Sequence, residues 1–152
     1  MDHQHDTRVD HPALLRSSGL RATTQRLRVL DFLGATPHAT ARDVLVGVRA
    51  AGASMSTQAV YDVLHALVGA GLARTIEPPG SSARYEVRVG DNHHHLICRG
   101  CGDVTDVDCA RGTSPCLTPA TDHGFVVDEA EIVYWGTCAA CARPTIPNEE
   151  LS

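Results

Sequence analysis

Hydrophobic residues in the first half of the chain recur at helical spacing, in short segments separated by Gly and Pro. The spacing predicts a short helix over Pro12–Ser18, ended by Gly19. Three further helices are predicted, each with a Ser or Thr at its start, where the side-chain oxygen can accept a hydrogen bond from the first turn. Their start residues and apolar stripes are Thr23 or Thr24 with Leu27, Leu30 and Leu33; Thr40 with Val44, Leu45 and Val48; and Ser56 or Thr57 with Val60, Leu64 and Leu67.

Two strand candidates follow these helices. They are Leu72–Glu77 and Ala83–Val89, and the turn signal Pro78-Pro79-Gly80-Ser81 separates them. Three helices, a capped fourth helix and a two-stranded hairpin form, in this order, a winged helix-turn-helix. In that arrangement the fourth helix enters the major groove of DNA and the hairpin touches the backbone. An ordinary small helical domain is the alternative, because periodicity alone does not separate the two.

The second half of the chain changes character and alternates in the manner of strands. The alternation places His93 and His95 on one face of a strand, and Val104 and Asp106 on one face of the next. The sequence therefore predicts an α+β protein with a winged-helix domain over residues 1–88 and an αβ dimerisation domain over residues 89–152. The small antiparallel sheet of the second domain would gain from pairing its edge with a second copy. Its predicted strands are His93–Cys98, Val104–Val107 and Phe125–Trp135.

Four cysteines in two CxxC pairs are the strongest chemical signal, namely Cys98, Cys101, Cys138 and Cys141. Soft sulfur ligands in a closed tetrahedral set select zinc, and the 36 residues between the pairs mean that the metal would join two distant strands. Two disulfides or four free thiols are the alternatives. The N-terminus is polar and no apolar run could cross a bilayer, so we expect a cytoplasmic protein with reduced thiols and no membrane partner.

Charge is distributed unevenly along the chain. The formal net charge is −5, and all thirteen basic residues are Arg. Residues 1–90 carry +2, whereas residues 91–152 carry −7. A mildly basic first half joined to an acidic second half rich in potential ligands is compatible with a DNA-reading domain joined to a metal-binding domain.

The exposed face of the fourth helix offers candidates for DNA contacts. Gln58 can pair with an adenine edge, and Tyr61 can contact a thymine methyl group or a phosphate. Asp62, on the same face, can select against a base or bond to a cytosine amine. The predicted DNA-binding residues are Arg16, Arg21, Thr57, Gln58 and Tyr61.

From about Leu14 to Cys141 the chain resembles the ferric uptake regulator (Fur) family of dimeric, metal-dependent repressors. The resemblance rests on Gln58-Ala59-Val60-Tyr61-Asp62-Val63-Leu64, on the His-His-His-Leu-Ile-Cys-Arg-Gly-Cys-Gly block that begins at His93, and on the last CxxC pair. Within the family the chain is most similar to the actinobacterial FurA/CatR group. The motifs that carry this similarity are Val89-Gly90-Asp91-Asn92-His93-His94-His95, Asp106-Val107-Asp108-Cys109 and Asp128-Glu129-Ala130-Glu131. That group is associated with repression of catalase-peroxidase genes.

The resemblance implies two metal sites in this chain. The four cysteines are implied as the structural zinc site. The regulatory site is implied at His38, Glu86, His93, His95 and Asp106. Without the resemblance, His38 would read as a solvated loop histidine. Three nitrogen and two carboxylate ligands suit Fe(II), Mn(II) or Zn(II).

The resemblance also implies a response to peroxide, with His38 and His93 as the ligands that become oxidised. Glu86 stands where the well-known peroxide sensors carry Asp, and glutamate there is typical of the iron-sensing branch, whereas Asp106 matches the peroxide branch. A glutamate can chelate through both oxygens and occupy the position that peroxide needs. Cys109 and Cys116 form a separate pair that is either idle or a reversible thiol switch.

The resulting expectation is a homodimeric repressor that binds an AT-rich inverted repeat in double-stranded DNA when Fe(II) or Mn(II) is bound, and that responds to peroxide. An iron-responsive uptake regulator is the alternative. A zinc-ribbon adaptor for protein partners would keep the cysteines but would have no need of the helix-turn-helix half. A zinc hydrolase is disfavoured because HExxH and comparable motifs are absent, so no enzyme activity is expected.

Overall fold

The computed structural model describes residues 9–87, 93–108, 121–126 and 132–142. The chain divides into two compact units, and each is described by itself. Of the described residues, 9–77 and 82–87 belong to the first unit, and 78–81, 93–108, 121–126 and 132–142 to the second. The predicted domain boundary between residues 88 and 89 lies outside the described residues.

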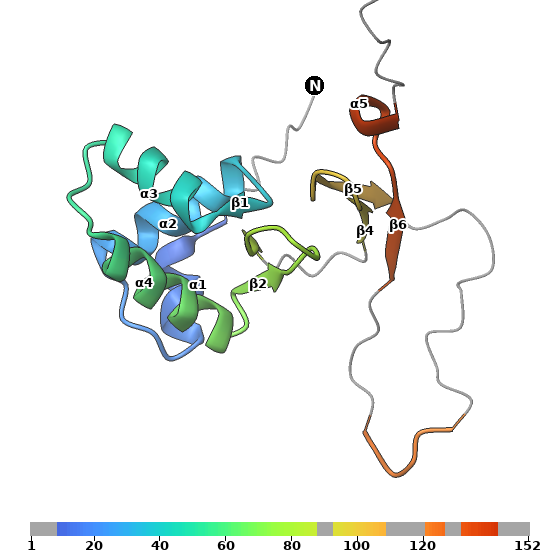
Figure 1. Cartoon of the computed structure of the whole chain (residues 1–152). Helices are drawn as coiled ribbons and strands as arrows, with labels where there is room; N and C mark the ends of the chain where they lie inside the picture. The colour runs from blue at the N-terminus through green and yellow to red at the C-terminus, as the bar shows by residue number, and fades with distance from the viewer. Residues whose placement is uncertain (1–8, 88–92, 109–120, 127–131, 143–152) are drawn as a thin grey trace, which may run out of the picture. The chain divides into compact units, whose positions relative to one another are not determined.

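The described part of the first unit contains four α-helices (Figure 1). Thr23, Thr40 and Ser56 cap the last three, and each side chain accepts a hydrogen bond from a backbone N–H three residues on. Thr40 forms a full capping box, because the Asp43 carboxylate accepts a hydrogen bond from the Thr40 N–H in return. The hydrogen bonds that Asp43 accepts from the Thr40 hydroxyl group and, to a smaller degree, from the Thr40 N–H lower the pKa of its carboxyl group. The helices are α1 (His11–Ser17), α2 (Thr24–Ala35), α3 (Ala41–Ala50) and α4 (Thr57–Gly69).

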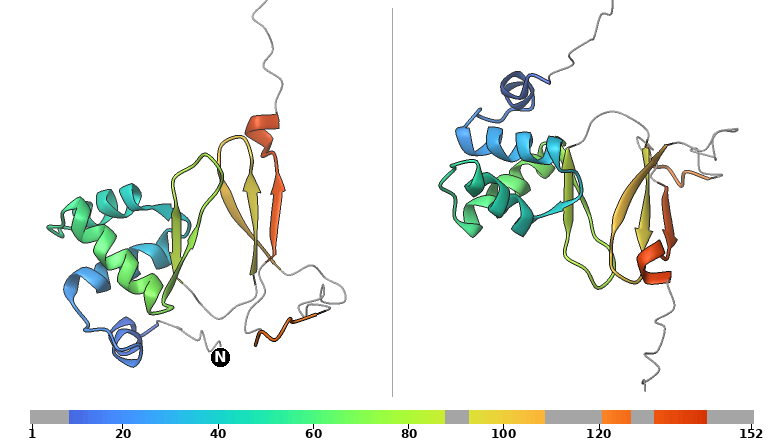
Figure 2. Two further views of the ribbon diagram at one scale, coloured as in Figure 1. Left: turned by 60° about the horizontal axis from the view of Figure 1, so that its bottom comes forward. Right: turned by 90° about the horizontal axis from the view of Figure 1, so that it is seen from above.

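The apolar stripes of these helices form the core of the first unit. Leu27 and Leu45 lie at the margin of the core, and Leu15 of α1 joins the centre. The ribbon views show α2, α3 and α4 packed together beside the hairpin (Figure 2). The remaining predicted stripe residues are at most 1% exposed, and they are Leu30, Leu33, Val44, Val48, Val60, Leu64 and Leu67.

A small antiparallel sheet completes the first unit. Its strands are β1 (Ala39–Thr40), β2 (Ala73–Ile76) and β3 (Arg84–Val87), in the order β1-β3-β2. The hairpin of β2 and β3 is the predicted wing. The sequence did not indicate β1, because two residues are too few to show an alternating pattern. Its pairing with β3 places the preceding residue, His38, beside the hairpin.

The second unit is built on β4 (His93–Cys98), β5 (Val104–Asp108) and β6 (Val133–Gly136), followed by the short helix α5 (Ala139–Ala142). The strand order is β5-β4-β6. β5 runs antiparallel to β4, as predicted, whereas β6 runs parallel to it. Ile97 of β4 and Val104 of β5 are buried, and they lie opposite each other in register.

The predicted strand Phe125–Trp135 is too long. The Asp122 carboxylate accepts a hydrogen bond from the Gly124 N–H, and the Asp122 carbonyl accepts one from the Phe125 N–H. Gly124 has a φ of 83°, in the left-handed region. This turn holds residues 121–126 outside any strand. β6 begins at Val133 because there the chain meets the central strand β4.

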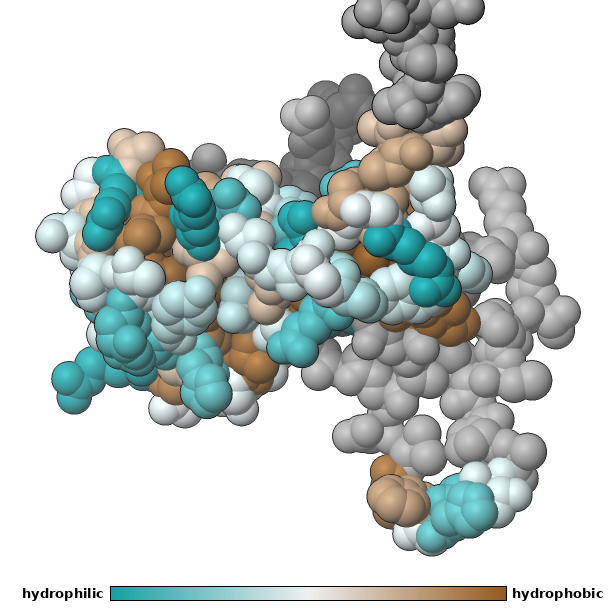
Figure 3. Space-filling view, viewed as in Figure 1, coloured by the Kyte–Doolittle hydropathy of each residue, from teal (hydrophilic) through white to brown (hydrophobic). Residues whose placement is uncertain are grey.

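Polar and apolar side chains are mixed on the surface of the first unit (Figure 3). Val46 and Tyr61 are the most exposed large hydrophobic residues of α3 and α4, at 61% and 49%. None of the described helices has both the length and the apolar character that a membrane span requires.

A close approach between α2 and α3 gives a stability test. An alanine Cβ at Gly47 of α3 would lie 1.9 Å from Phe32 Cε2, whereas one at Gly34 of α2 would meet nothing within 4 Å. We expect Gly34→Ala to raise the free energy of unfolding by about 0.5–1 kcal/mol through helix propensity. Gly47→Ala should lower it by about 1 kcal/mol, because displacement of the ring outweighs the same gain. Urea unfolding followed by circular dichroism measures both, and an equal increase for both variants would contradict the packing argument.

Candidate metal centres and nucleic-acid interface

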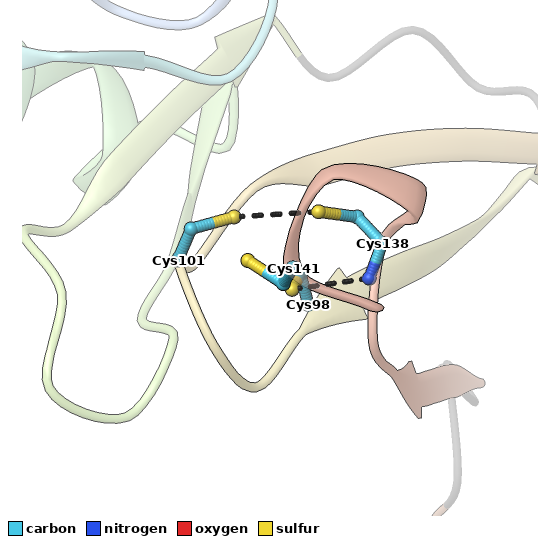
Figure 4. Close-up of side chains that lie close together, drawn as sticks. All are labelled: Cys98, Cys101, Cys138 and Cys141. Atoms are coloured by element: carbon cyan, nitrogen blue, oxygen red, sulfur yellow. Dashed lines mark hydrogen bonds between the residues drawn. The ribbon is translucent and has the colours of Figure 1, made fainter. Parts of the chain in front are cut away.

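The two CxxC pairs come together in the second unit. Cys98 ends β4, and Cys101 lies in the turn that follows. Cys138 lies between β6 and α5, and Cys141 is on α5. Parallel pairing of β4 with β6 puts Cys98 opposite Gly136. The pairing therefore brings the second CxxC pair close to the first in space. The side chains converge in the close-up of this region (Figure 4).

The cysteine cluster has the dimensions of a tetrahedral zinc site. Its four sulfur atoms all lie within 4.8 Å of one another, and Cys101 Sγ lies 3.7 Å from Cys138 Sγ. Four Zn–S bonds of about 2.3 Å in tetrahedral geometry place neighbouring sulfur atoms about 3.8 Å apart. All four cysteines are free thiols rather than disulfides. The donor set and its spacing therefore fit a structural zinc ion.

Backbone groups already prepare one sulfur as a thiolate. The N–H groups of Cys138, Cys101 and Gly100 donate hydrogen bonds to Cys98 Sγ and lower the pKa of this thiol to about 6. Protons shared with the neighbouring sulfurs act in the opposite direction on Cys141 and raise its pKa to about 12. Four thiols this close cannot all ionise without a cation, so the cluster favours a bound divalent ion.

A second group of ligand-type residues lies in the first unit. His38 Nε2 is 2.8 Å from Glu86 Oε2, and both side chains are buried. The Arg74 guanidinium donates a hydrogen bond from Nε to the other carboxylate oxygen, Glu86 Oε1. His38 is therefore a buried residue that faces a carboxylate, not a solvated loop histidine.

The backbone of His38 is fixed in an unusual conformation. Its φ is 61°, in the left-handed region that few non-glycine residues adopt. Arg84 of β3 donates a hydrogen bond to the His38 carbonyl at 3.2 Å, and Ala39 begins the pairing with β3. A strained conformation persists only where its surroundings determine it, as they do here.

A third group lies in the second unit, where β4 faces β5. His95 pairs in register with Asp106, and His95 Nε2 lies 3.4 Å from Asp106 Oδ1. The His95 side chain is fully buried, whereas that of Asp106 is 41% exposed. His93 pairs in register with Asp108 on the same strands, but its side chain lies outside the described part of the chain. Cys109 and Cys116 also lie outside the described residues.

Sequence reasoning missed Arg74. The signal was available, because a hairpin whose turn is centred on Gly80 pairs residue 74 with residue 86. In the structure Arg74 and Glu86 are direct partners in the antiparallel register of β2 and β3. Their side chains form an ion pair on one face of the wing.

The predicted reading face of α4 is exposed. Thr57, Gln58 and Tyr61 all face solvent, as do Arg16 on α1 and Arg21 after it. Asp62 is also exposed, and its carboxylate accepts a hydrogen bond of 2.8 Å from Gln58 Nε2. Asp62 thus engages one donor of the Gln58 amide group.

Comparison with known proteins identifies the family. Residues 17–134 match the family model described as "Ferric uptake regulator family". The chain belongs to the ferric uptake regulator family. It is 54% identical over 133 residues to the transcriptional regulator FurA of Mycobacterium tuberculosis, covering 88% of this chain and 90% of the relative. It is also 54% identical over 129 residues to ferric uptake regulation protein 1 of Mycolicibacterium fortuitum, with coverages of 85% and 80%.

Solved Fur structures share the fold. The manganese-containing Fur of Pseudomonas aeruginosa aligns with a TM-score of 0.71 and 26% identity over 84% of this chain and 96% of that one. The predicted resemblance to Fur, and to FurA within it, is confirmed, as is the winged-helix fold class. This Fur protein is a metal-dependent transcriptional regulator, and its relatives are named regulators rather than enzymes.

Removal of one cysteine tests the zinc assignment in this Fur protein. We expect Cys101→Ala to lose bound zinc and the folded sheet of the second unit, because structural zinc contributes about 10 kcal/mol or more to small metal-dependent folds. Cys109→Ala should keep the zinc, since the predicted site excludes this residue. Elemental analysis and circular dichroism measure the two effects. Full zinc content in Cys101→Ala would contradict the four-cysteine site.

Proposed function

We propose that this Fur protein is a homodimeric repressor that binds an AT-rich inverted repeat with Fe(II) or Mn(II) bound, and that peroxide releases it from catalase-peroxidase and other antioxidant genes. In this proposal residues 1–88 form the DNA-binding domain and residues 89–152 the metal-binding dimerisation domain, and the protein acts in the cytoplasm. The observation that carries the proposal is the buried pair of His38 and Glu86. A buried histidine and carboxylate cost desolvation free energy that an apolar pair would not, and both can ligate a metal, so we infer that they form half of a metal site.

The proposed regulatory ligands come from both units. His38 and Glu86 belong to the first, and His95 and Asp106 to the second, where His93 precedes His95 on β4. Nitrogen and carboxylate donors suit Fe(II) and Mn(II), whereas the thiolate set of the other site suits Zn(II). An ion held by residues of both units would restrict how the units can be oriented, and thereby the spacing of two α4 helices in a dimer.

Control of DNA binding then follows from linkage. An ion that binds the DNA-competent arrangement more tightly than the others shifts the population towards it, and DNA raises the affinity for the ion by the same factor. The ligand residues supply this difference, because the two groups can bind one ion only in arrangements that bring them together.

Peroxide can end this state irreversibly. A ferrous ion in the site supplies the one-electron chemistry that makes peroxide reactive beside its ligands. In the overall reaction the O–O bond of the peroxide breaks, one oxygen atom enters a C–H bond of the imidazole ring of His38 or His93, and the other oxygen leaves as water. The altered ring is a poorer ligand, so the repressor loses the ion and releases its operator.

Dimerisation is supported by one face of the second sheet. Leu96 of β4 and Tyr134 of β6 are neighbours in register, and they are 43% and 40% exposed. An apolar sheet face of this kind gains from burial against a second copy.

An iron-responsive regulator is the second candidate. Glu86 supports it, because a glutamate that binds through both oxygens fills the coordination position that peroxide needs. The relative named ferric uptake regulation protein 1 supports it equally. A protein-interaction adaptor is disfavoured, because membership of the Fur family accounts for the helical unit.

Fluorescence anisotropy with anaerobic protein separates the candidates. The DNA is drawn from upstream of its own gene and of neighbouring genes, and the protein is zinc-loaded with no further metal, with Mn(II) or with Fe(II). We expect binding only with Mn(II) or Fe(II), and loss of binding after brief peroxide only in the Fe(II) sample. Mass spectrometry should then find one added oxygen atom on His38 or His93.

Two other outcomes decide against this proposal. Binding that requires Fe(II) but survives peroxide identifies an iron regulator. Metal-independent binding, or no binding to any of these sequences, would contradict the proposal that this protein binds operator DNA in a metal-dependent manner.

Substitutions on the surface of the first unit test the DNA contacts. We expect Gln58→Ala to cost about 1–3 kcal/mol on the best operator and to relax the preference at one base pair. Arg16→Ala should weaken binding to all sequences alike and lower the salt dependence by about one phosphate contact. Ser17→Ala, next to Arg16 on α1, is the control that should change neither quantity. A Gln58→Ala protein with unaltered base preference would show that α4 does not read the DNA through this residue.

A further inference from the structure

Arg74 and Glu86 form an arrangement that the proposed function does not use. The antiparallel register of β2 and β3 sets the two residues directly opposite each other. Arg74 Nε donates to Glu86 Oε1, and His38 Nε2 lies 2.8 Å from Glu86 Oε2. The two oxygens of one carboxylate are thus engaged by two different partners.

Burial makes this division persistent. The Glu86 side chain is 3% exposed and that of Arg74 is 21% exposed. A carboxylate that loses its partner at such a depth is left as an uncompensated buried charge, which is strongly destabilising. The Arg74 guanidinium has donors only and no atom that ligates a metal, so its hydrogen bond to Oε1 can persist while an ion binds the other oxygen.

The other carboxylate oxygen, Glu86 Oε2, faces His38 instead of an arginine. The His38–Glu86 contact joins two groups that can both ligate a metal, and an ion can bind both of them in place of this contact. The Arg74 guanidinium differs from the His38 ring because it is itself a cation and cannot share a metal ion with the carboxylate. Glu86 therefore offers Oε2 to an ion while Oε1 remains with Arg74.

We propose that Arg74 is a positioning residue that restricts Glu86 to binding the regulatory ion through a single oxygen. This inference rests on the proposed regulatory site. Three histidines, Asp106 and one Glu86 oxygen would supply five ligand atoms, and an ion that accepts six would then keep one position for another ligand. The longer glutamate is thereby made to act like the aspartate of peroxide sensors, and the apparent conflict between Glu86 and peroxide sensing is resolved.

A second consequence concerns affinity. A fixed positive charge near a divalent ion opposes its binding, and single-oxygen ligation removes one ligand atom. Both effects weaken the site relative to the same ligands without Arg74. The site would therefore exchange its ion readily, as a sensor must.

The test compares Arg74→Met, which removes the charge and the donors, with Arg74→Lys, which keeps the charge. Arg42→Met removes one exposed arginine on α3 and is the matched control. Mn(II) affinity is measured by competition with a chelator on zinc-loaded protein. Co(II) then serves as a spectroscopic probe, since six-coordinate Co(II) absorbs visible light more weakly than five-coordinate Co(II).

We expect Arg74→Met to bind Mn(II) about tenfold more tightly, equivalent to about 1.4 kcal/mol. Its Co(II) complex should absorb more weakly, because Glu86 then binds through both oxygens. Oxidation of His38 or His93 by peroxide should slow in the Fe(II) form. Arg74→Lys should stay close to wild type in all three measurements, and Arg42→Met should match wild type.

Unchanged Mn(II) affinity and an unchanged Co(II) spectrum in Arg74→Met would overturn the inference. If that variant does not fold, Arg74→Gln, which keeps a neutral donor, must give the same shifts in smaller degree. Glu86→Gln separates this inference from the proposed function. If it leaves Mn(II) affinity intact, the proposed regulatory site itself is wrong; if it weakens Mn(II) while Arg74→Met has no effect, only the role of Arg74 is wrong.

Discussion

The second unit depends on four cysteine side chains that are too close together to ionise independently. Backbone N–H groups hold Cys98 as a thiolate, while protons shared among the sulfurs raise the pKa of Cys141 to about 12. A divalent ion that binds four thiolates removes this conflict. An ion bound there would join the end of β4 to the segment after β6, and would thereby support the parallel pairing of strands that lie far apart in the sequence. Few of the described side chains in this sheet are buried and apolar, so metal binding would take the place of the core that a larger domain has.

The first unit differs because its polar groups are buried beside an apolar core. Its core is apolar and complete without a metal, yet it buries the carboxylate of Glu86 at the edge of a hairpin. Arg74 and His38 make this burial tolerable, and the left-handed backbone of His38 is part of the arrangement. Such groups do little for stability, because a well-packed apolar set of the same volume is often as stable. Their presence beside an otherwise apolar core points to chemistry, which is why the proposed regulatory site begins there.

The sequence anticipated these features unequally, for physical reasons. Helix caps and stripes are local signals, so Thr40 with Val44 and Val48 placed α3 correctly. β1 could not be predicted from the local sequence, because its pairing partner β3 lies more than forty residues away in the chain. Phe125 appeared strand-like, but the turn at Gly124 overrides its propensity. Arg74 could have been found from the hairpin register, whereas the burial of His38 could not, because it follows from a pairing that the local sequence does not specify.

The two proposed metal sites have different donors and would therefore suit two different uses of a metal. Four thiolates bind a soft ion tightly, and a structural site loses nothing by being nearly permanent. A sensor gains nothing from tight binding as such, because an ion with equal affinity for both arrangements shifts no population. What matters is the difference in affinity and the freedom to exchange and to react. Residues that touch a ligand rather than the ion can set these properties without altering the donor set. In the proposed regulatory site Arg74 would act in this way, since its contact with the far oxygen of Glu86 would affect how that ligand binds while the fold of the wing stays the same.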